Sequence, residues 1–296
     1  MTDSKDRRML LVHAHPDDET IGCGATMAKY ANEGAAVTLV TCTLGEEGEI
    51  LVSELAHLGV DQLDTLGHHR EDELRDAMAA LGVQDWRLLG GAHKYRDSGM
   101  LGTPSNNREG CFWQADLLAA ALDLVPVIRA DRPQVLITYD DFGGYGHPDH
   151  VKAHRTAMYA AQLAAARTFR PDLGPVWDVP KVYWTAIPKS MISRGVRALR
   201  EAGDTSDFAK MDPDNVSFGT DDELVTTAID ARQFSDQKVR ALHCYPTQIS
   251  TDSGFFSLAD MDGAMGVEYY RLVKGDLGPV DESGHEIDLF GGLVGG

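Results

Sequence analysis

Two short segments of this 296-residue chain combine histidine and aspartate around a proline. "AHPDDE" occupies residues 14–19 and "GYGHPDHV" occupies residues 144–151, and each follows an apolar run. Histidine and carboxylate side chains are the ligands of catalytic zinc sites, which use three protein ligands and leave one position for water. The two segments together therefore predict a hydrolytic metal centre.

Helix capping is the simpler interpretation of these acidic residues. Proline after each histidine suits the first turn of a helix, where its missing N–H costs nothing. Asp17, Asp18 or Asp149 would then lie near the positive end of a helix dipole. Capping needs one small acid, however, whereas two loops here supply several acids and histidines, so we favour metal binding for the set. The residues alone do not decide whether Asp17 or Asp18 binds the metal.

The elements that must position these residues alternate between strand and helix patterns. Strand patterns occur at residues 9–14, 35–45, 86–91, 134–140 and 181–188, and helix patterns at 19–34, 71–82, 112–133 and 148–167. This alternation predicts an α/β fold with a Rossmann-like, mostly parallel sheet and helices on both faces. Ligands of such sheets bind beyond the carboxyl ends of the strands, where both segments fall.

The pattern loosens after residue 170. We expect a Rossmann-like core at residues 7–170 that carries both His-Pro-Asp segments, and a smaller C-terminal α/β elaboration at 171–296 that completes the substrate pocket. Within this elaboration, residues 222–244 predict one long helix, and residues 253–273 mix loop and strand signals. The last glycines of the tail are typical of a disordered end.

Composition limits the partners and the compartment. The net charge of −19 argues against nucleic acid or an anionic membrane as partner, because both need a basic surface. No apolar window is long enough to span a bilayer, and the N-terminal segment lacks the pattern of a secretory signal. The four cysteines are widely spaced without a CxxC pair, which favours reduced thiols and a cytoplasmic location.

The two His-Pro-Asp segments resemble the paired signatures of the PIG-L/LmbE-like zinc deacetylases, which act on N-acetylglucosamine conjugates. Further similarity lies in "TCTLGEEGE" (41–49), "RDSGM" (96–100), "VPKVYWT" (179–185) and "TQI" (247–249). These segments are most similar to the branch of the family that deacetylates N-acetylglucosaminyl-inositol in mycothiol biosynthesis. The resemblance implies a zinc-dependent N-deacetylase whose partner is a small amino-sugar conjugate.

The resemblance also implies which residues bind the metal. His15, Asp18 and His150 would hold one Zn²⁺ per chain, although histidine and aspartate ligands also suit Fe²⁺. Asp17 would then be the general base that takes a proton from the attacking water. The resemblance thus separates the roles of Asp17 and Asp18.

Three residues of the second segment receive catalytic roles from the same resemblance. His147 would stabilise the oxyanion or protonate the leaving amine, Asp149 would orient the His147 ring, and Tyr145 would contact the acetyl carbonyl. The implied substrate-binding residues are Arg70, Asp97, Glu49 and Gln248.

Some residues have simpler interpretations. Arg70 could be a solvated charge at the start of a helix. Glu49 could simply be a charged residue that keeps its loop soluble. His68 and His69 match no role in the family, and we expect them to be exposed to solvent. His154 follows His150 at the spacing of a helical zinc pair, but the glutamate of the HExxH motif is missing. We therefore expect His154 behind the ligands or at the surface.

Two other functions remain open from the sequence. A mycothiol S-conjugate amidase of the same superfamily would share the catalytic residues, but the loops at 41–49 and 96–105 favour the acetyl-removing enzyme. A non-catalytic sugar-binding module is the second alternative. It is disfavoured because every expected catalytic position is filled.

Overall fold

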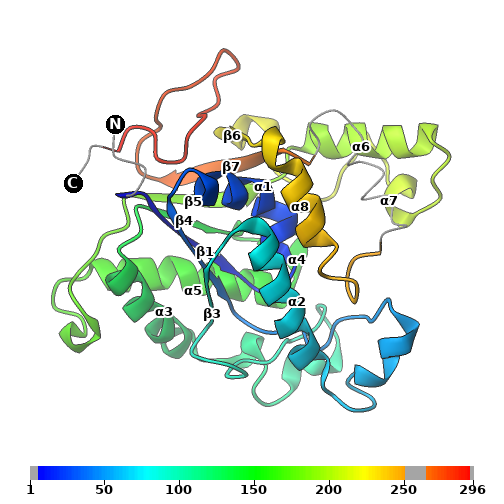
Figure 1. Ribbon diagram of the computed structural model, residues 1–296, viewed down its shortest axis with the longest axis horizontal. Coiled ribbons are helices and arrows are strands. Elements are labelled where there is room, and N and C mark those ends of the chain that lie inside the picture. Colours follow the sequence, from blue (N-terminus) through cyan, green and yellow to red (C-terminus); the bar gives the residue numbers. More distant parts are fainter. Residues whose placement is uncertain (1–5, 251–264, 294–296) are drawn as a thin grey trace.

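The computed structural model describes residues 6–250 and 265–293 (Figure 1). Among these residues, seven strands form one sheet in the order β3-β2-β1-β4-β5-β7-β6. The first five of these strands are parallel, and β7 runs antiparallel to both β5 and β6. The strands are β1 (Arg8–His13), β2 (Ala36–Thr41), β3 (Asp85–Leu88), β4 (Val135–Thr138), β5 (Lys181–Ala186), β6 (Thr227–Asp230) and β7 (Val267–Lys274). The predicted α/β fold is confirmed.

Helices cover both faces of the sheet. One face carries α1 (Asp18–Asn32), α2 (Leu66–Leu81) and α8 (Ser235–Leu242), and the other carries α3 (Leu117–Asp131) and α5 (Pro148–Ala165). The remaining α-helices of the described residues are α4 (Gly143–Gly146), α6 (Lys189–Glu201) and α7 (Asp207–Lys210). None of the helices described is both long and apolar enough to cross a membrane.

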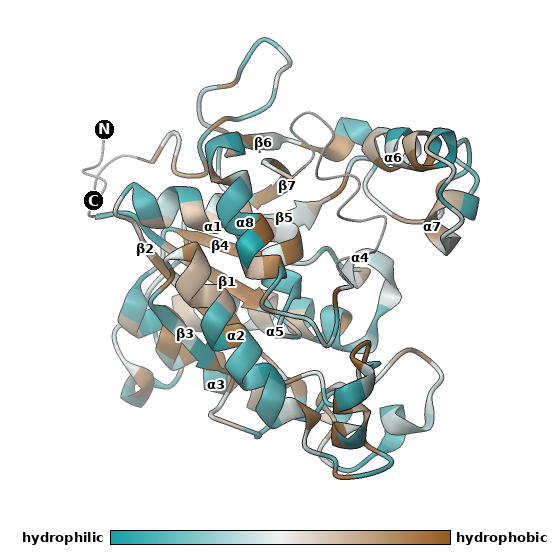
Figure 2. Cartoon of the chain, turned by 45° about the vertical axis from the view of Figure 1, so that its right-hand side comes forward, coloured by the Kyte–Doolittle hydropathy of each residue, from teal (hydrophilic) through white to brown (hydrophobic). Residues whose placement is uncertain are grey.

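Strand β1 shows why its sequence is an unbroken apolar run. Successive side chains of a strand point to opposite faces of the sheet. Leu11 accordingly belongs to the core beneath α1, α2 and α8, whereas Leu10 belongs to the core beneath α3 and α5. Both are fully buried, so no position of this strand favours a polar residue. Figure 2 shows the resulting hydrophobic centre between helices with hydrophilic outer surfaces.

The prediction of one long helix at residues 222–244 is wrong. The structure has strand β6 at Thr227–Asp230, and only Ser235–Leu242 is α-helical. Thr227 and Ile229 alternate with more exposed residues and pair with β7. β-branched residues fit such a strand, and tertiary pairing overrides the weak helical period around them.

The C-terminal part contributes to the same sheet as the N-terminal part. Strand β7, within the segment of mixed signals, lies between β5 and β6. Helices α6 and α7 were not predicted. Residues up to 293 are described, with Leu289 and Phe290 buried, and the glycines predicted to be disordered lie at residues outside the described range.

Candidate metal centre

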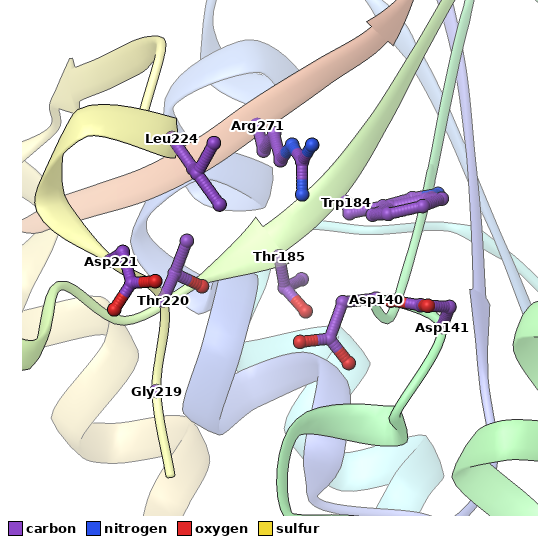
Figure 3. A pocket seen from close by; sticks show the side chains of 9 residues that line it. All are labelled: Asp140, Asp141, Trp184, Thr185, Gly219, Thr220, Asp221, Leu224 and Arg271. Atoms are coloured by element: carbon purple, nitrogen blue, oxygen red, sulfur yellow. The ribbon is translucent and has the colours of Figure 1, made fainter. Parts of the chain in front are cut away.

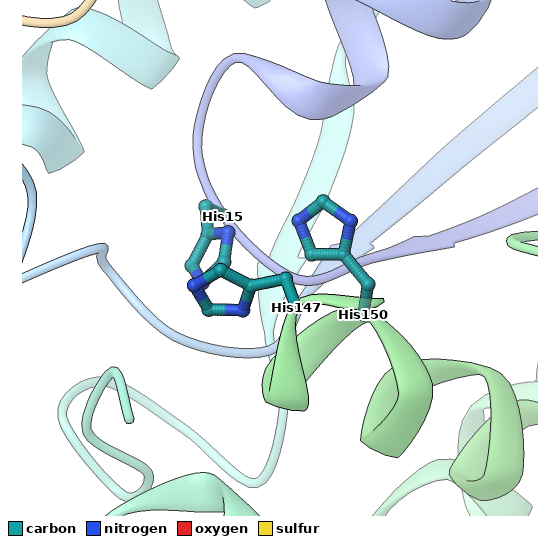
Figure 4. Close-up of side chains that lie close together, drawn as sticks. All are labelled: His15, His147 and His150. Carbon is teal, nitrogen blue, oxygen red and sulfur yellow. The ribbon is translucent and has the colours of Figure 1, made fainter. Parts of the chain in front are cut away.

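The two His-Pro-Asp loops lie side by side because β1 and β4 are neighbours in the sheet. His15 follows β1, and His147 and His150 begin helix α5. Ring centroids are 4.6 Å apart for His15 and His147, 5.2 Å for His15 and His150, and 5.0 Å for His147 and His150 (Figure 4). Candidate ligand atoms of all three lie within 4.8 Å of one another. The topology thus brings the two predicted loops together.

Asp18 lies between the two histidines that were predicted to bind the metal with it. Its Oδ2 atom is 3.2 Å from His15 Nδ1 and 3.3 Å from His150 Nε2. Tetrahedral zinc with bonds of about 2.0–2.1 Å separates its ligand atoms by roughly 3.3–3.4 Å. The separations of Asp18 from His15 and from His150 therefore match the spacing of ligand atoms around a divalent metal ion.

The hydrogen bonds of His150 also suit a ligand. Its Nδ1 lies 3.1 Å from the carbonyl oxygen of Gly143, so Nδ1–H donates there and Nε2 keeps its lone pair. Within the described part of the chain, this buried Nε2 has no hydrogen-bond partner. Metal-binding histidines commonly donate their other N–H to a carbonyl or carboxylate, and a bound cation would satisfy the free nitrogen.

His15 has carboxylates at both ends of its ring. Nδ1 faces Asp18, while Nε2 lies 3.4 Å from Asp149 Oδ2 and 3.5 Å from Asp97 Oδ1. Burial alone would lower the pKa of His15, but the carboxylates, with Asp97 foremost, outweigh it and raise the pKa well above its usual value. The same negative charges would attract a metal cation.

Tyr139 is a site residue that the sequence analysis missed. Its hydroxyl donates to Asp18 Oδ2 at 2.7 Å and accepts from the Ala14 N–H at 2.8 Å. Its ring stacks on His150 with centroids 4.3 Å apart. Burial favours the neutral form of Asp18, but His150 and His15 outweigh it and hold the Asp18 pKa well below its usual value. Asp18 is thus held in its ionised form, the form in which a carboxylate can bind a cation.

Asp17 does not cap helix α1 with its side chain. Its backbone has φ of 111°, a region rarely adopted by residues other than glycine, and its N–H donates to Glu19 Oε2 at 3.1 Å. Its Oδ2 accepts from Arg70 Nη2 at 3.0 Å. Burial raises the pKa of Asp17 to about 8 against the opposing effect of Arg70. A cation beside Asp18 would act with Arg70 and favour the ionised carboxylate.

Arg70 is not a solvated charge, because its side chain is buried. It donates to Gly45 O at 2.9 Å and to Pro16 O, besides Asp17. Arg70 therefore holds the first His-Pro-Asp loop from the side of α2.

Asp97 is buried beneath His15, with its oxygens accepting from the backbone N–H groups of Glu47 at 3.1 Å and Gly99 at 2.8 Å. Glu49 is exposed, and its carbonyl accepts from Gln248 Nε2 at 2.9 Å. Of the four predicted substrate-binding residues, Arg70 and Asp97 thus contact the first His-Pro-Asp loop, whereas Glu49 and Gln248 reach the surface.

His147 caps helix α5 through its ring. Nδ1 accepts from the Asp149 N–H at 3.1 Å, so a neutral ring carries its proton on Nε2 and can donate from there. Burial, followed by the charges of His15 and His150, lowers the pKa of His147 to about 3. The neutral, donating ring favours the oxyanion-stabilising role over protonation of the amine.

Asp149 orients His147 with its backbone and not with its carboxylate, which differs from the expected arrangement. The carboxylate accepts from the N–H of Ser98 at 2.8 Å and from the Ser98 hydroxyl, and it faces His15. The carboxylate is fully buried among these partners. Ser98 was not singled out from the sequence, since no spacing relates it to the His-Pro-Asp segments.

Tyr145 lies on a glycine-rich turn beside the histidines. Gly143, Gly144 and Gly146 all have positive φ, and the Tyr145 ring is 5.0 Å from that of His150. Half of Tyr145 is exposed, so its side chain is accessible to a ligand beside the two His-Pro-Asp loops. Burial of the hydroxyl group raises the Tyr145 pKa, which keeps it protonated as a donor.

His154 lies behind Tyr139, whose ring stacks on the proposed ligand His150, and so takes the first of its two expected positions. It is buried, and its Nδ1 is 2.9 Å from the carbonyl oxygen of Tyr139. His154 therefore supports the end of strand β4.

A polar cavity of about 120 Å³ is lined in part by the loop that follows β4 (Figure 3). Asp140, Asp141, Trp184 and Arg271 are among its lining residues. Asp140 Oδ1 accepts from the N–H groups of Phe142 at 3.1 Å and Gly144 at 2.7 Å. Asp140 thus shapes the turn that leads to Tyr145 and His147.

Comparison with known proteins decides the family. The PIG-L family model, described as GlcNAc-PI de-N-acetylase, matches residues 10–161. The chain belongs to this family. A PIG-L relative from Catenulispora acidiphila, named 1D-myo-inositol 2-acetamido-2-deoxy-alpha-D-glucopyranoside deacetylase 1, is 58% identical over 97% of this chain and 90% of its own. A deacetylase of the same name from Kribbella flavida is 56% identical over 99% of this chain and 100% of its own.

Solved structures show the same fold at low identity. The N,N'-diacetylchitobiose deacetylase from Pyrococcus horikoshii matches with a TM-score of 0.62 and 18% identity, over 93% of this chain and 87% of that one. A 4-carboxy-2-hydroxymuconate hydratase from Pseudomonas putida matches with a TM-score of 0.61 and 17% identity, over 93% and 99%. Since one is a deacetylase and the other a hydratase, this fold alone does not determine the reaction.

Proposed function

We propose that this PIG-L protein removes the acetyl group from N-acetylglucosaminyl-inositol, the deacetylation step of mycothiol biosynthesis. The observation that carries the proposal is the near full-length identity of 51–58% to relatives named 1D-myo-inositol 2-acetamido-2-deoxy-alpha-D-glucopyranoside deacetylase. The site geometry supports the hydrolytic chemistry, and the four free cysteines support the cytoplasm as compartment.

The proposed catalytic cofactor is one divalent metal ion per chain, held by His15, Asp18 and His150. Zinc fits these donors, and iron(II) is compatible with the same set. When bound, the ion would polarise the acetyl carbonyl and lower the pKa of the attacking water. The remaining chemistry falls to the side chains around it.

Asp17 and His147 supply the acid–base and electrostatic parts of the proposed reaction. Asp17, held by Arg70, would accept the proton of the attacking water. His147 would donate from Nε2 to the oxygen that becomes negative as the amide carbonyl is attacked. Tyr145, a protonated donor on the same side, would contact the acetyl group.

The C-terminal part would complete the substrate pocket through its contact with the loop at 41–49. Thr247 donates to Glu73 at 3.1 and 2.7 Å, and its carbonyl accepts from Leu51 N–H at 2.9 Å. This anchors Gln248 next to Glu49, where both can bind sugar or inositol hydroxyls. The proposal thus assigns the chemistry to the 7–170 part and the aglycone contacts to both parts.

The test is amine release from N-acetylglucosaminyl-inositol, before and after chelation and with metal restored. We expect activity that a chelator abolishes and Zn²⁺ or Fe²⁺ restores. Assays with a mycothiol S-conjugate and with plain N-acetylglucosamine rank the substrates. Faster cleavage of the S-conjugate would overturn the substrate assignment, and activity that survives complete metal removal would overturn the mechanism.

A further inference from the structure

We propose a second divalent-cation site in this protein, formed by His68, Glu71 and His93. The candidate ligand atoms of these three residues lie within 4.8 Å of one another. The rings of His68 and His93 have centroids 4.3 Å apart, and His93 Nε2 is 3.9 Å from Glu71 Oε2. Neither the family resemblance nor the catalytic chemistry uses these residues.

Two separate segments build this cluster. His68 and Glu71 are three residues apart near the start of α2, so both point to one face of the helix. His93 comes from the turn after β3 and has φ of 58°, whereas Gly90 and Gly91 take the other positive φ values of that turn. A positive φ costs more conformational free energy for histidine than for glycine. In this turn it directs the His93 side chain toward α2.

The chemistry of the cluster selects the kind of cation. Two imidazoles and one carboxylate are donors that zinc, nickel(II) and copper(II) accept, whereas magnesium and calcium prefer oxygen ligands throughout. His68 and His93 are exposed and line a cavity of about 400 Å³, which leaves room for water to complete the coordination. Small rotations of the exposed His68 and His93 side chains can bring their donor atoms from within 4.8 Å of one another to the spacing of metal ligands.

A bound cation would join two segments that support the catalytic centre. The N-terminal part of α2 also carries Arg70, which donates a hydrogen bond to Asp17. The turn with His93 continues to Asp97, which faces His15. The cation would therefore stabilise the arrangement of both segments. Because its donors are exposed, we expect weaker binding here than at the buried catalytic site. This second ion would be additional to the one metal per chain that the sequence analysis expects at His15, Asp18 and His150.

The test is calorimetric titration of Zn²⁺ into full-length protein already loaded with one equivalent of zinc. We expect a second, weaker binding event for the wild type. His93→Ala and His68→Gln should each weaken this event by at least about tenfold while retaining the first equivalent. His285→Ala, a change on the C-terminal loop, should leave both events unchanged. His150→Ala should instead lose the tight equivalent.

Thermal unfolding gives a second measurement that does not depend on activity. Added Zn²⁺ should raise the Tm of the zinc-loaded wild type and of His285→Ala, but not that of His93→Ala or His68→Gln. The proposal is overturned if the wild type binds no second equivalent, or if both cluster variants keep the second event and the Tm increase. Failure of the catalytic assay would leave these results unaffected, so the two proposals are judged separately.

Discussion

Asp17 and Asp18 are adjacent carboxylates with different surroundings. Asp18 lies between two imidazoles and accepts from Tyr139, whereas Asp17 faces Arg70. We predict that Asp18→Asn loses the tightly bound metal. Asp17→Asn should keep it but lower kcat by about 10²–10⁴-fold, the usual contribution of a general base. Metal analysis together with kcat at full metal occupancy checks both. Full metal content in Asp18→Asn would contradict the ligand assignment.

Arg70 is predicted to act through Asp17, because it is buried and donates to Asp17 Oδ2 and to two carbonyls of the neighbouring loops. Arg70→Gln should lower kcat by roughly 10–100-fold with metal content retained, a share of the 10²–10⁴-fold base contribution. The loss should be similar on N-acetylglucosaminyl-inositol and on plain N-acetylglucosamine. A loss confined to KM for the inositol conjugate would instead support the aglycone contact implied by the family resemblance.

The turn before α5 uses a glycine to position His150, a proposed metal ligand. Gly143 has φ of +70°, and a Cβ there would lie 2.7 Å from His150 Cβ and 2.8 Å from Val151 N. Gly143→Ala must therefore move the backbone that carries His150. Gly144 has a similar φ of +75°, but a Cβ there would meet open space. Gly144→Ala therefore introduces the same kind of backbone strain without a steric clash against His150.

We predict that Gly143→Ala lowers metal affinity at least about tenfold more than Gly144→Ala, as displacement of ligand-supporting groups typically does. Competition with a coloured chelator measures both variants. Equal affinities would show that backbone strain, and not the position of His150, governs the effect.

At the scale of elements, the sequence predicts best where one physical cause dominates. The β1 and β2 runs are recognisable because both faces of each strand are buried. Gly82 ends α2 in the left-handed conformation, as its position indicated. Residues 222–244 are mispredicted because Thr227 and Ile229 obtain their strand structure from β7, which lies far along the chain.

The candidate site follows the same rule. The sequence alone indicates His15, Asp18 and His150, because histidine and aspartate occur close together in each of the two loops. The sequence does not indicate Tyr139 or Ser98 as site residues. The Tyr139 hydroxyl contacts Asp18 because β4 lies beside β1, and the Ser98 hydroxyl contacts Asp149 from a loop far away in sequence. The burial of Arg70 and Asp97 could not be predicted, because the patterns place them at a helix start and in a loop.

At the scale of the whole molecule, Glu286 joins the C-terminal segment to the sheet. This buried carboxylate accepts from Lys181 Nζ, from the Tyr183 hydroxyl at 2.6 Å and from the Thr227 hydroxyl at 3.1 Å. Removing its charge leaves the buried Lys181 without its counter-ion, which typically costs about 3–5 kcal/mol.

We therefore predict that Glu286→Gln lowers the free energy of unfolding by roughly 3–5 kcal/mol, measured by urea denaturation. The exposed Glu282 provides the control, and Glu282→Gln should change stability by less than about 0.5 kcal/mol. A similar small effect for both variants would show that the Lys181–Glu286 pair contributes little.

The place of β7 between β5 and β6 has a consequence for the order of events on the ribosome. All of β1 to β5 and both His-Pro-Asp loops are synthesised before β7, which begins at Val267. Until then β6, whose described strand partner is β7, cannot join the sheet, and β5 remains an open edge. A nascent chain halted at this stage would carry all three proposed metal ligands together with an unpaired strand edge. Such edges are the feature through which unfinished sheets associate with one another.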